Sequence, residues 1–190
     1  GEYVSERADR LAWLTGFTGS AGMAAVAAES AAVFTDGRYT LQAETEVDGT
    51  LYARRHITDQ PVTEWIIETL SDGQRLGYDP WLMTPAQLSR YRTACKKAGV
   101  ELCPSDGNPV DAVWPDQPPP PLAPVSPLAA KYTGETSSEK RNRIGALLKS
   151  EDTDAVVLTA PDSIAWLFNI RGSDVPFTPF ALSFAILHAD

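Results

Sequence analysis

Short apolar runs and amphipathic stretches alternate from the start of the chain to residue 103, which is the pattern of an α/β domain. The apolar runs predict strands over residues 22–28, 31–34, 51–55, 75–78 and 100–103. The amphipathic stretches predict helices over residues 6–14, 38–46, 62–70 and 85–98, with Ser5 as the N-cap of the first and Gly99 as the C-cap of the last. Only Glu29 and Ser30 separate the first two strands, so we expect these strands to form a hairpin.

Proline density marks a domain boundary near the middle of the chain. Seven of the thirteen residues from 115 to 127 are proline, a density that excludes a helix or a central strand and favours an extended polyproline conformation. We therefore predict a first domain over residues 1–114, a stiff linker over residues 115–130 and a second domain over residues 131–190. The alternative is a proline-rich ligand for the aromatic groove of a partner protein, which the position between two folded regions disfavours.

The alternation restarts beyond the linker and soon stops. It predicts a helix over residues 136–148 that the capping box of Thr136 and Glu139 opens, a buried strand over 155–158, a short helix over 162–168 and a buried strand over 181–187. A buried strand needs a partner strand or a covering layer, yet the chain ends at Asp190, so we expect the second domain to be truncated. The chain also begins with Gly1 in place of an initiator Met. We therefore expect a piece of a longer protein that lacks the first strand of its first domain.

Charge and composition disfavour several classes of function. The chain carries 25 acidic and 16 basic residues, a net charge of −9, and its Lys and Arg residues form no stripe that could neutralise phosphates, so nucleic-acid binding is disfavoured. No apolar run approaches the length needed to cross a membrane, so we expect a cytoplasmic protein without membrane contact. Cys95 and Cys103 form no CxxC pair, and we expect free thiols in a reducing compartment.

The residues alone reveal no catalytic or metal-binding motif. The two histidines, His56 and His188, lack the spacing of metal ligands, and we interpret them as surface or structural residues. The chain has no GxSxG elbow, no phosphate-binding loop of the GxxxxGK type and no GxGxxG motif after a strand. The glycine-rich segment from Gly16 to Gly22 leads into a predicted strand rather than a helix, so we interpret it as a tight turn and not as a phosphate cradle.

The sequence TDGRY, residues 35–39, is a candidate binding segment. Asp36 follows a strand and can cap the next helix, which would place Arg38 in the first turn, against the helix dipole. One interpretation is that a negative group approaches Arg38. The other is that Arg38 forms a salt bridge with a neighbouring carboxylate such as Asp36 or Glu6, and the residues alone favour this second interpretation.

Residues 164–174 form a second such segment, in which an aromatic helix leads into a polar turn. Trp166 and Phe168 are predicted to anchor the core. Arg171 and Asp174 either pair with each other across the turn or contact a ligand, and the pairing is the interpretation that we favour.

Five segments, read in order, resemble one known family over almost the whole chain. They are YVSERADRLAWLTGFTGSAG, FTDGRYTLQA, GYDPWLMTP, NPVDAVWPDQPP and IAWLFNIRGSDVPFTPF. Together the chain resembles the long, three-domain form of Xaa-Pro aminopeptidase (aminopeptidase P). The resemblance implies a creatinase N-terminal-like α/β domain, a mixed sheet flanked by helices, followed by a truncated second domain of the same type.

The same resemblance implies an activity and a place for its chemistry. Members of this family are homodimeric, usually cytoplasmic metallo-exopeptidases that release the first residue from peptides with proline in second position. Two divalent ions, commonly manganese, are held in a third, pita-bread domain that is absent here, so the resemblance implies no catalytic residue, metal ligand or cofactor in this chain, which would be inactive alone. The expected partners are Xaa-Pro peptides and a second copy of the protein.

One site residue follows from the resemblance. The family's first domain contributes the arginine of TDGRY to peptide binding, and the matching residue is Arg38, which shifts our interpretation from a salt bridge to substrate contact. The alternative functions are a non-catalytic peptide-binding or scaffolding module of the same fold and, less favoured, a small-molecule-binding α/β domain.

Overall fold

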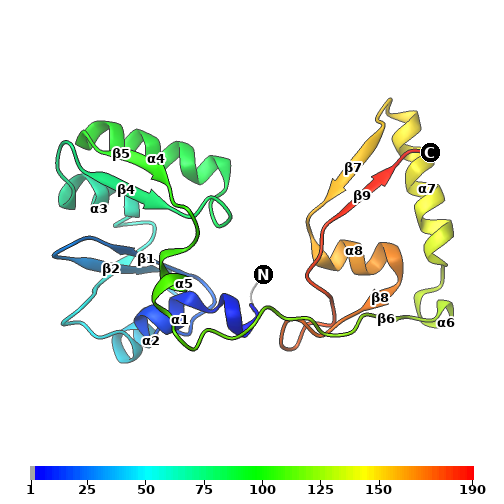
Figure 1. Cartoon of the computed structure of the whole chain (residues 1–190), viewed down its shortest axis with the longest axis horizontal. Coiled ribbons are helices and arrows are strands. Elements are labelled where there is room, and N and C mark those ends of the chain that lie inside the picture. Colours follow the sequence, from blue (N-terminus) through cyan, green and yellow to red (C-terminus); the bar gives the residue numbers. More distant parts are fainter. Residues whose placement is uncertain (1–2) are drawn as a thin grey trace. The chain divides into compact units, whose positions relative to one another are not determined.

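The computed structural model describes residues 3–190, which divide into two compact units (Figure 1). The first unit comprises residues 9–117, and the second comprises residues 3–8 and 118–190. Across this described part of the chain, no helix combines the length and the hydropathy that crossing a bilayer requires.

The first unit contains a mixed sheet and a parallel pair of strands. Strands β1 (Gly22–Val26), β2 (Ala31–Thr35) and β3 (Ala53–His56) lie in that order, with β1 antiparallel and β3 parallel to β2. Strands β4 (Arg75–Tyr78) and β5 (Glu101–Pro104) form the parallel pair. The predicted hairpin and the α/β fold class are therefore confirmed.

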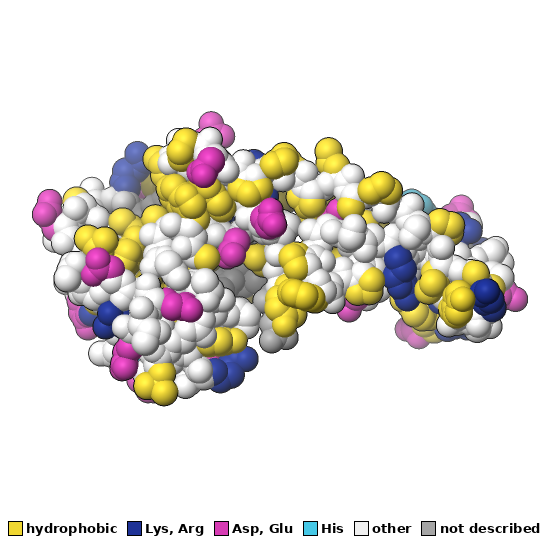
Figure 2. Space-filling view, turned by 90° about the horizontal axis from the view of Figure 1, so that it is seen from below, with side chains coloured by type: hydrophobic (Ala, Val, Ile, Leu, Met, Phe, Trp, Pro, Cys, Tyr) yellow, Lys and Arg dark blue, Asp and Glu magenta, His cyan; other side chains and the backbone are white. Residues whose placement is uncertain are grey.

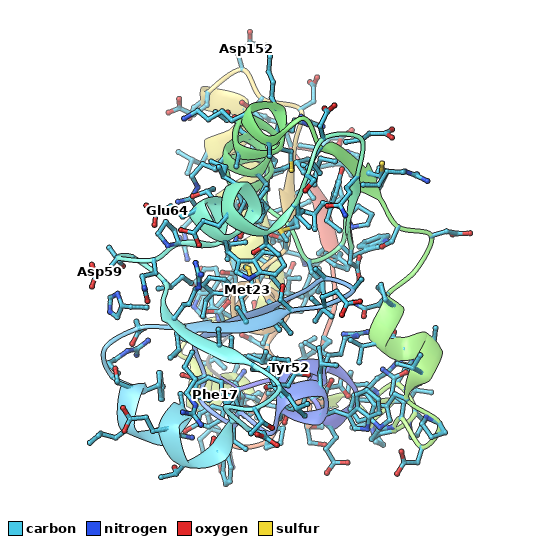
Figure 3. The ribbon with its side chains drawn as sticks, turned by 90° about the vertical axis from the view of Figure 1, so that its left-hand side faces the viewer. Phe17, Met23, Tyr52, Asp59, Glu64 and Asp152 are labelled. Carbon is cyan, nitrogen blue, oxygen red and sulfur yellow. The ribbon has the colours of Figure 1, made fainter. Side chains whose placement is uncertain are left out.

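Helices pack on both faces of the mixed sheet because the side chains of β2 alternate between two apolar clusters. Ala32 and Phe34 pack against helices α3 (Val62–Thr69) and α4 (Pro85–Ala98). Val33 points the other way, into a cluster that includes Phe17 and residues of α1 (Arg10–Thr15) and α2 (Thr40–Glu46). Figure 3 shows Met23 on one side of the sheet and Phe17 and Tyr52 on the other.

Three details of the first unit differ from the predictions. The helix expected over residues 6–14 is broken into a 3-10 turn over Glu6–Ala8 and helix α1. Helix α2 begins at Thr40, so Arg38 lies in the turn before the helix and not in its first turn. Helix α5 (Pro109–Val113) was not predicted from the sequence. It packs against α1 through an ion pair between Arg10 and Asp111 at 2.8 Å and through the stacked rings of Trp13 and Trp114.

The second unit is a small assembly of helices and strand pairs. Helices α6 (Ala130–Thr133), α7 (Ser137–Ser150) and α8 (Pro161–Phe168) accompany the antiparallel pairs β6 (Ser126–Pro127) with β8 (Ile170–Arg171) and β7 (Ala155–Leu158) with β9 (Ala185–His188). The predicted capping box is confirmed, since Thr136 and Glu139 exchange hydrogen bonds at the start of α7. Ile164, Ala165 and Leu167 of α8 are buried.

Two predictions for the second unit were wrong. The strand expected over residues 181–187 is shorter, Ala185–His188, and only one of its faces is covered, because Ile186 is 62% exposed. Trp166, predicted to anchor the core, is 46% exposed, and its indole ring lies against two cations of α7, the buried Lys140 and Arg143. The proline-rich stretch after Trp114 forms neither helix nor strand until Ser126 in this part of the structure.

Candidate functional site

Arg38 lies in a tight turn between β2 and α2, and its side chain is bound by Asp36. The Nε and Nη2 atoms of Arg38 donate to the two carboxylate oxygens of Asp36 at 3.0 and 2.8 Å, and the backbone N–H of Arg38 donates to Oδ1 at 3.0 Å. These hydrogen bonds lower the pKa of Asp36, and the bond from the Arg38 side chain has the largest effect. The salt bridge that the residues alone favoured is therefore present, and contact between Arg38 and a substrate remains a prediction.

The guanidinium of Arg38 also lies over an aromatic ring. Its central carbon is 5.1 Å from the centroid of the Tyr39 ring, which packs edge-on against buried Phe17. The Tyr39 hydroxyl and the Ser20 hydroxyl are 2.7 Å apart and share a hydrogen bond. The Arg38 side chain remains 65% exposed. The turn thus presents to solvent a guanidinium that Asp36 and Tyr39 contact, a suitable hydrogen-bond donor for a carbonyl or carboxylate oxygen.

The glycine-rich loop beside this turn already binds a carboxylate of its own unit. The backbone N–H and the hydroxyl of Thr18 donate to Glu46 at 2.8 and 2.9 Å, and the backbone bond is the main cause of the lowered pKa of Glu46. The loop leads into β1 and not into a helix. Both observations agree with a tight turn and speak against a phosphate cradle.

A cavity of about 330 Å³ opens beside the turn, and its wall includes four charged or titratable residues, Glu44, Arg54, Arg55 and His56. Three of these have partners nearby: Arg54 donates to the carbonyl oxygen of Val47, Arg55 to the Glu68 carboxylate at 2.8 Å, and Nδ1 of His56 lies 3.2 Å from the Asp59 carboxylate. The structural interpretation of His56 therefore agrees with its surroundings.

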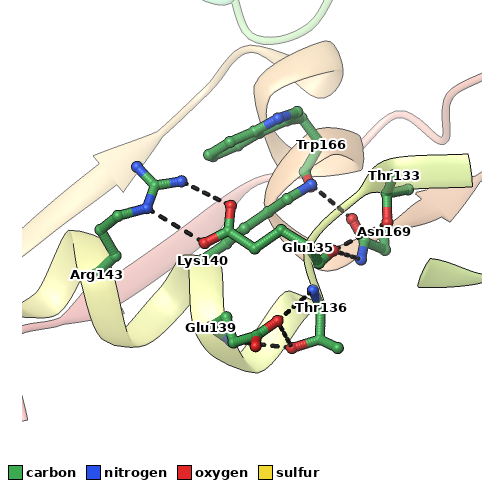
Figure 4. Close-up of polar contacts among 8 residues, drawn as sticks. All are labelled: Thr133, Glu135, Thr136, Glu139, Lys140, Arg143, Trp166 and Asn169. Carbon is green, nitrogen blue, oxygen red and sulfur yellow. Dashed lines mark hydrogen bonds and ion pairs between the residues drawn. The ribbon is translucent and has the colours of Figure 1, made fainter. Parts of the chain in front are cut away.

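The second unit contains a buried cation that the sequence reading missed (Figure 4). Lys140 on α7 is 2% exposed, and its Nζ donates to Asn169 Oδ1 at 2.7 Å and to the Trp166 carbonyl oxygen at 3.0 Å. The same Nζ lies 4.4 Å from the Trp166 ring centroid. Asn169 ends α8 in the left-handed region, at φ 52°, so the ammonium binds the carbonyl end of that helix. An Asn directly after an apolar helical run is the one sequence signal that indicates such a cap.

In the same unit, Arg171 and Asp174 do not form the predicted pair, because each has other hydrogen-bond partners. Asp174 accepts backbone N–H groups from Ala123 at 3.2 Å and Leu182 at 2.8 Å, while Nη1 of Arg171 donates to the carbonyl oxygen of Ile170. The expected pair across the turn was wrong, because the buried carboxylate of Asp174 joins two loop segments instead. Arg171 does line a cavity of about 600 Å³ together with Lys140, Tyr132 and Phe180.

The side chains that could bind a metal ion do not form a cluster in the described part of the chain. Among residues 3–190, no group of three or more His, Cys, Asp or Glu side chains is placed to hold a metal ion. Cys95 and Cys103 are both free thiols, as expected, and burial raises the pKa of Cys95. On the face shown in Figure 2, Lys and Arg side chains are scattered among acidic and apolar ones.

Sequence comparison assigns both halves of the chain to one domain type. A profile of the Creatinase/Prolidase N-terminal domain matches residues 3–113, and a second profile of the same description matches residues 116–190. The chain is 36% identical to human Xaa-Pro aminopeptidase 2 over 189 residues, which cover 98% of this chain and 28% of the relative. It is 38% identical to the probable Xaa-Pro aminopeptidase P of Neurospora crassa, covering 100% of this chain and 28% of that protein.

A solved structure agrees with the sequence relatives. The chain is similar to the X-prolyl aminopeptidase of Caenorhabditis elegans, described as a cytosolic enzyme with a di-nuclear active site, with a TM-score of 0.88 and 34% identity. The match covers 100% of this chain and 31% of that structure. The chain therefore spans less than a third of the length of the relatives that it matches.

Proposed function

The chain belongs to the creatinase/prolidase N-terminal domain family, and on this premise we propose that it forms the N-terminal part of an Xaa-Pro aminopeptidase. The activity we propose for the complete protein is release of the N-terminal residue from peptides with proline in second position. Similarity to aminopeptidases over the whole of this chain supports the proposal. Since the chain spans less than a third of these relatives, bond cleavage is assigned to the complete polypeptide and not to these residues alone.

The role we assign to this part is peptide binding through Arg38. One observation carries it: the guanidinium is fixed by Asp36 and Tyr39, yet 65% of the side chain is exposed. A guanidinium so placed can donate hydrogen bonds to a peptide oxygen that lies away from the scissile bond. Binding at such a remote position helps to orient the substrate for reaction elsewhere.

The complete enzyme is proposed to be metal-dependent, with two divalent ions, manganese by preference, bound outside this chain. Support comes from the di-nuclear site of the Caenorhabditis elegans enzyme. Such an ion pair activates a water molecule and polarises the scissile carbonyl. The residues described here offer no matching cluster of ligands, so the role we propose for them is substrate access and subunit contact in a cytoplasmic homodimer.

Arg38→Ala in the complete enzyme tests this function. We expect kcat/KM on Xaa-Pro peptides to fall about ten- to a hundredfold, chiefly through KM, because a charge-assisted hydrogen bond is lost. Arg143→Ala is the matched control, since Arg143 forms a similar two-bond pair with Glu135 in the second unit. Equal kinetics for wild type and Arg38→Ala would refute the peptide-binding role.

A non-catalytic peptide-binding or scaffolding module is the alternative. It predicts that the complete polypeptide binds Xaa-Pro peptides, or a protein partner, without releasing the first residue. An assay of the complete, manganese-loaded protein for that release decides between the two functions.

A further inference from the structure

We propose that Asp36 and Tyr39 are positioning residues that hold the guanidinium of Arg38 in the orientation in which it binds a neutral peptide carbonyl oxygen. The inference rests on the proposed peptide-binding role of Arg38 and adds two things to it. It names the residues that set the geometry of the donor, and it names the chemical group that the donor recognises.

Asp36 holds the side chain through three local hydrogen bonds. The two carboxylate oxygens bind Nε and Nη2 of Arg38 at 3.0 and 2.8 Å, and Oδ1 also accepts the backbone N–H of the same residue at 3.0 Å. The carboxylate therefore bonds both ends of Arg38, its backbone and its guanidinium. Because the two residues are only two positions apart, the turn itself determines where the guanidinium points.

Tyr39 supplies a flat support for the guanidinium, 5.1 Å from the centroid of its ring. The ring itself has little freedom, because it packs edge-on against Phe17, which is 1% exposed, and its hydroxyl is hydrogen-bonded to Ser20. The chain of contacts thus runs from the core of the first unit through the Tyr39 ring to the exposed guanidinium.

This arrangement has a thermodynamic consequence for binding. An exposed arginine loses rotamer freedom when it binds a ligand, which costs affinity unless the side chain is already ordered. Asp36 and Tyr39 order Arg38 before the peptide arrives. Their removal should therefore weaken binding about two- to tenfold, even though Arg38 remains present.

The same contacts indicate which group Arg38 recognises. The carboxylate of Asp36 lies against the guanidinium and offsets its charge, so the pair as a whole attracts a distant anion only weakly. A neutral carbonyl oxygen still accepts a hydrogen bond from such a pair. We therefore infer that Arg38 binds a backbone carbonyl of the substrate and not its terminal carboxylate.

The test uses the complete, metal-loaded enzyme and an Xaa-Pro-Xaa tripeptide whose C-terminus is amidated. The amide removes the substrate's carboxylate, so that loss of the Asp36 charge cannot be masked by a stronger attraction between Arg38 and an anion. Asp36→Asn is nearly isosteric, and we expect it to raise KM about two- to tenfold with kcat unchanged. We expect Arg38→Ala to raise KM at least as much, and by a similar factor for the free acid and the amide.

Tyr39 variants and a matched control separate positioning from folding. Tyr39→Phe keeps the ring and loses only the hydroxyl bond to Ser20, so it should raise KM less than Tyr39→Leu, which removes the aromatic support altogether. Glu135→Gln removes a carboxylate from the equivalent pair with Arg143, whose bonds are 3.2 and 2.8 Å long, and should leave KM unchanged. As a second readout in residues 1–190, nitrogen-15 relaxation of the Arg38 side chain should show more motion in Asp36→Asn than in wild type.

The outcomes distinguish this inference from the function on which it rests. If Arg38→Ala leaves KM unchanged, the peptide-binding role itself is wrong. If Arg38→Ala raises KM while Asp36→Asn and Tyr39→Leu do not, Arg38 binds peptide but the positioning inference is wrong. If Arg38→Ala raises KM only for the free acid, the recognised group is a carboxylate, and the assignment of a carbonyl is overturned.

Discussion

At the scale of single residues, Lys140 is a charged side chain whose position depends on two hydrogen-bond acceptors. Its Nζ binds Asn169 Oδ1 and the Trp166 carbonyl oxygen, and the side chain is 2% exposed. Lys140→Met keeps the length of the side chain and removes the donor from the buried Asn169 amide oxygen and from the partly buried Trp166 carbonyl oxygen. We expect the variant to lower the free energy of unfolding of the second unit by about 2–4 kcal/mol, as measured by urea unfolding.

Lys131→Met is the control for this prediction, because Lys131 is exposed and lies on the neighbouring helix α6 of the same unit. It should change the stability by less than about 0.5 kcal/mol. If Lys140→Met is as stable as Lys131→Met, apolar packing replaces the ammonium fully and the hydrogen bonds add nothing.

Glu46 gives the pH dependence that the structure predicts. Hydrogen bonds from Thr18 lower its pKa in the folded state, so the carboxylate stabilises the fold above its unfolded pKa of about 4.3. This contribution is lost as the pH falls through the lower, folded pKa. We therefore expect Glu46→Gln to be less stable than wild type at pH 7 and equally stable once the pH is below the folded pKa.

Urea midpoints measured from pH 7 down to about pH 3 check the Glu46 prediction. Glu44→Gln removes the same charge from the same helix at an exposed position and serves as the control. A stability difference between Glu46→Gln and wild type that stayed constant over this range would show that the lost packing of the side chain, and not its ionisation, is responsible.

The sequence predicted some of these residue contacts and not others, for a physical reason. The pair of Asp36 and Arg38 could be foreseen because the residues are two positions apart. The contact of Lys140 with Asn169 joins residues 29 positions apart, which no local pattern reports. Trp166 was assigned to the core because it is aromatic, but the ring is 46% exposed and lies against the cations of Lys140 and Arg143.

At the scale of elements, two glycines with the same backbone angle allow a sharp comparison. Gly16 ends α1 and Gly73 lies in the turn before β4, and both have φ +79°. A Cβ on Gly16 would lie 2.9 Å from the Glu46 carbonyl oxygen, whereas a Cβ on Gly73 would meet nothing within 4 Å. At Gly16, the loop between α1 and β1 therefore lies so close to α2 that a residue with a Cβ atom would clash.

The prediction is that both alanine variants lose stability, but unequally. Gly73→Ala should cost about 1–2 kcal/mol for the left-handed conformation alone. Gly16→Ala should cost about 1–3 kcal/mol more, because the backbone of α2 must also move. Urea unfolding of the two variants measures the difference, and equal losses would mean that the first unit absorbs the contact by a small shift of α2.

Elements were predicted best where local chemistry alone sets their ends. The bounds of α4 agree because the N-cap Thr84 and Gln87 in the first turn form a capping box at its start, and Gly99 follows it in the left-handed conformation. The strands β4 and β7 also have their predicted bounds. By contrast, the helix expected over residues 6–14 breaks after Ala8, where the chain passes from the second unit to the first, and a hydrophobic pattern carries no information about such a change.

At the scale of the whole molecule, the fold class followed from the alternation of apolar and amphipathic segments, whereas the function did not. Composition and motifs yielded no active site, and Arg38 was identified through the family motif TDGRY. The physical reason is that the binding role proposed for this part rests on a single side chain, the Arg38 guanidinium, and that residues 3–190 contain no group of three or more His, Cys, Asp or Glu side chains placed to hold a metal ion.

Tests on the complete protein and on residues 1–190 can show which part binds the metal ions. If the complete protein is the metal-dependent aminopeptidase that we propose, a chelator should abolish its release of the first residue, and manganese should restore it. In residues 1–190, neither the chelator nor manganese should shift the urea midpoint, because the described residues hold no group of three or more ligands. A metal site within this chain would instead stabilise the fold by about 2.7 kcal/mol at a free manganese concentration of 100 times its dissociation constant. A shift of that size would place a metal site within this chain and contradict the assignment of both ions to the rest of the enzyme.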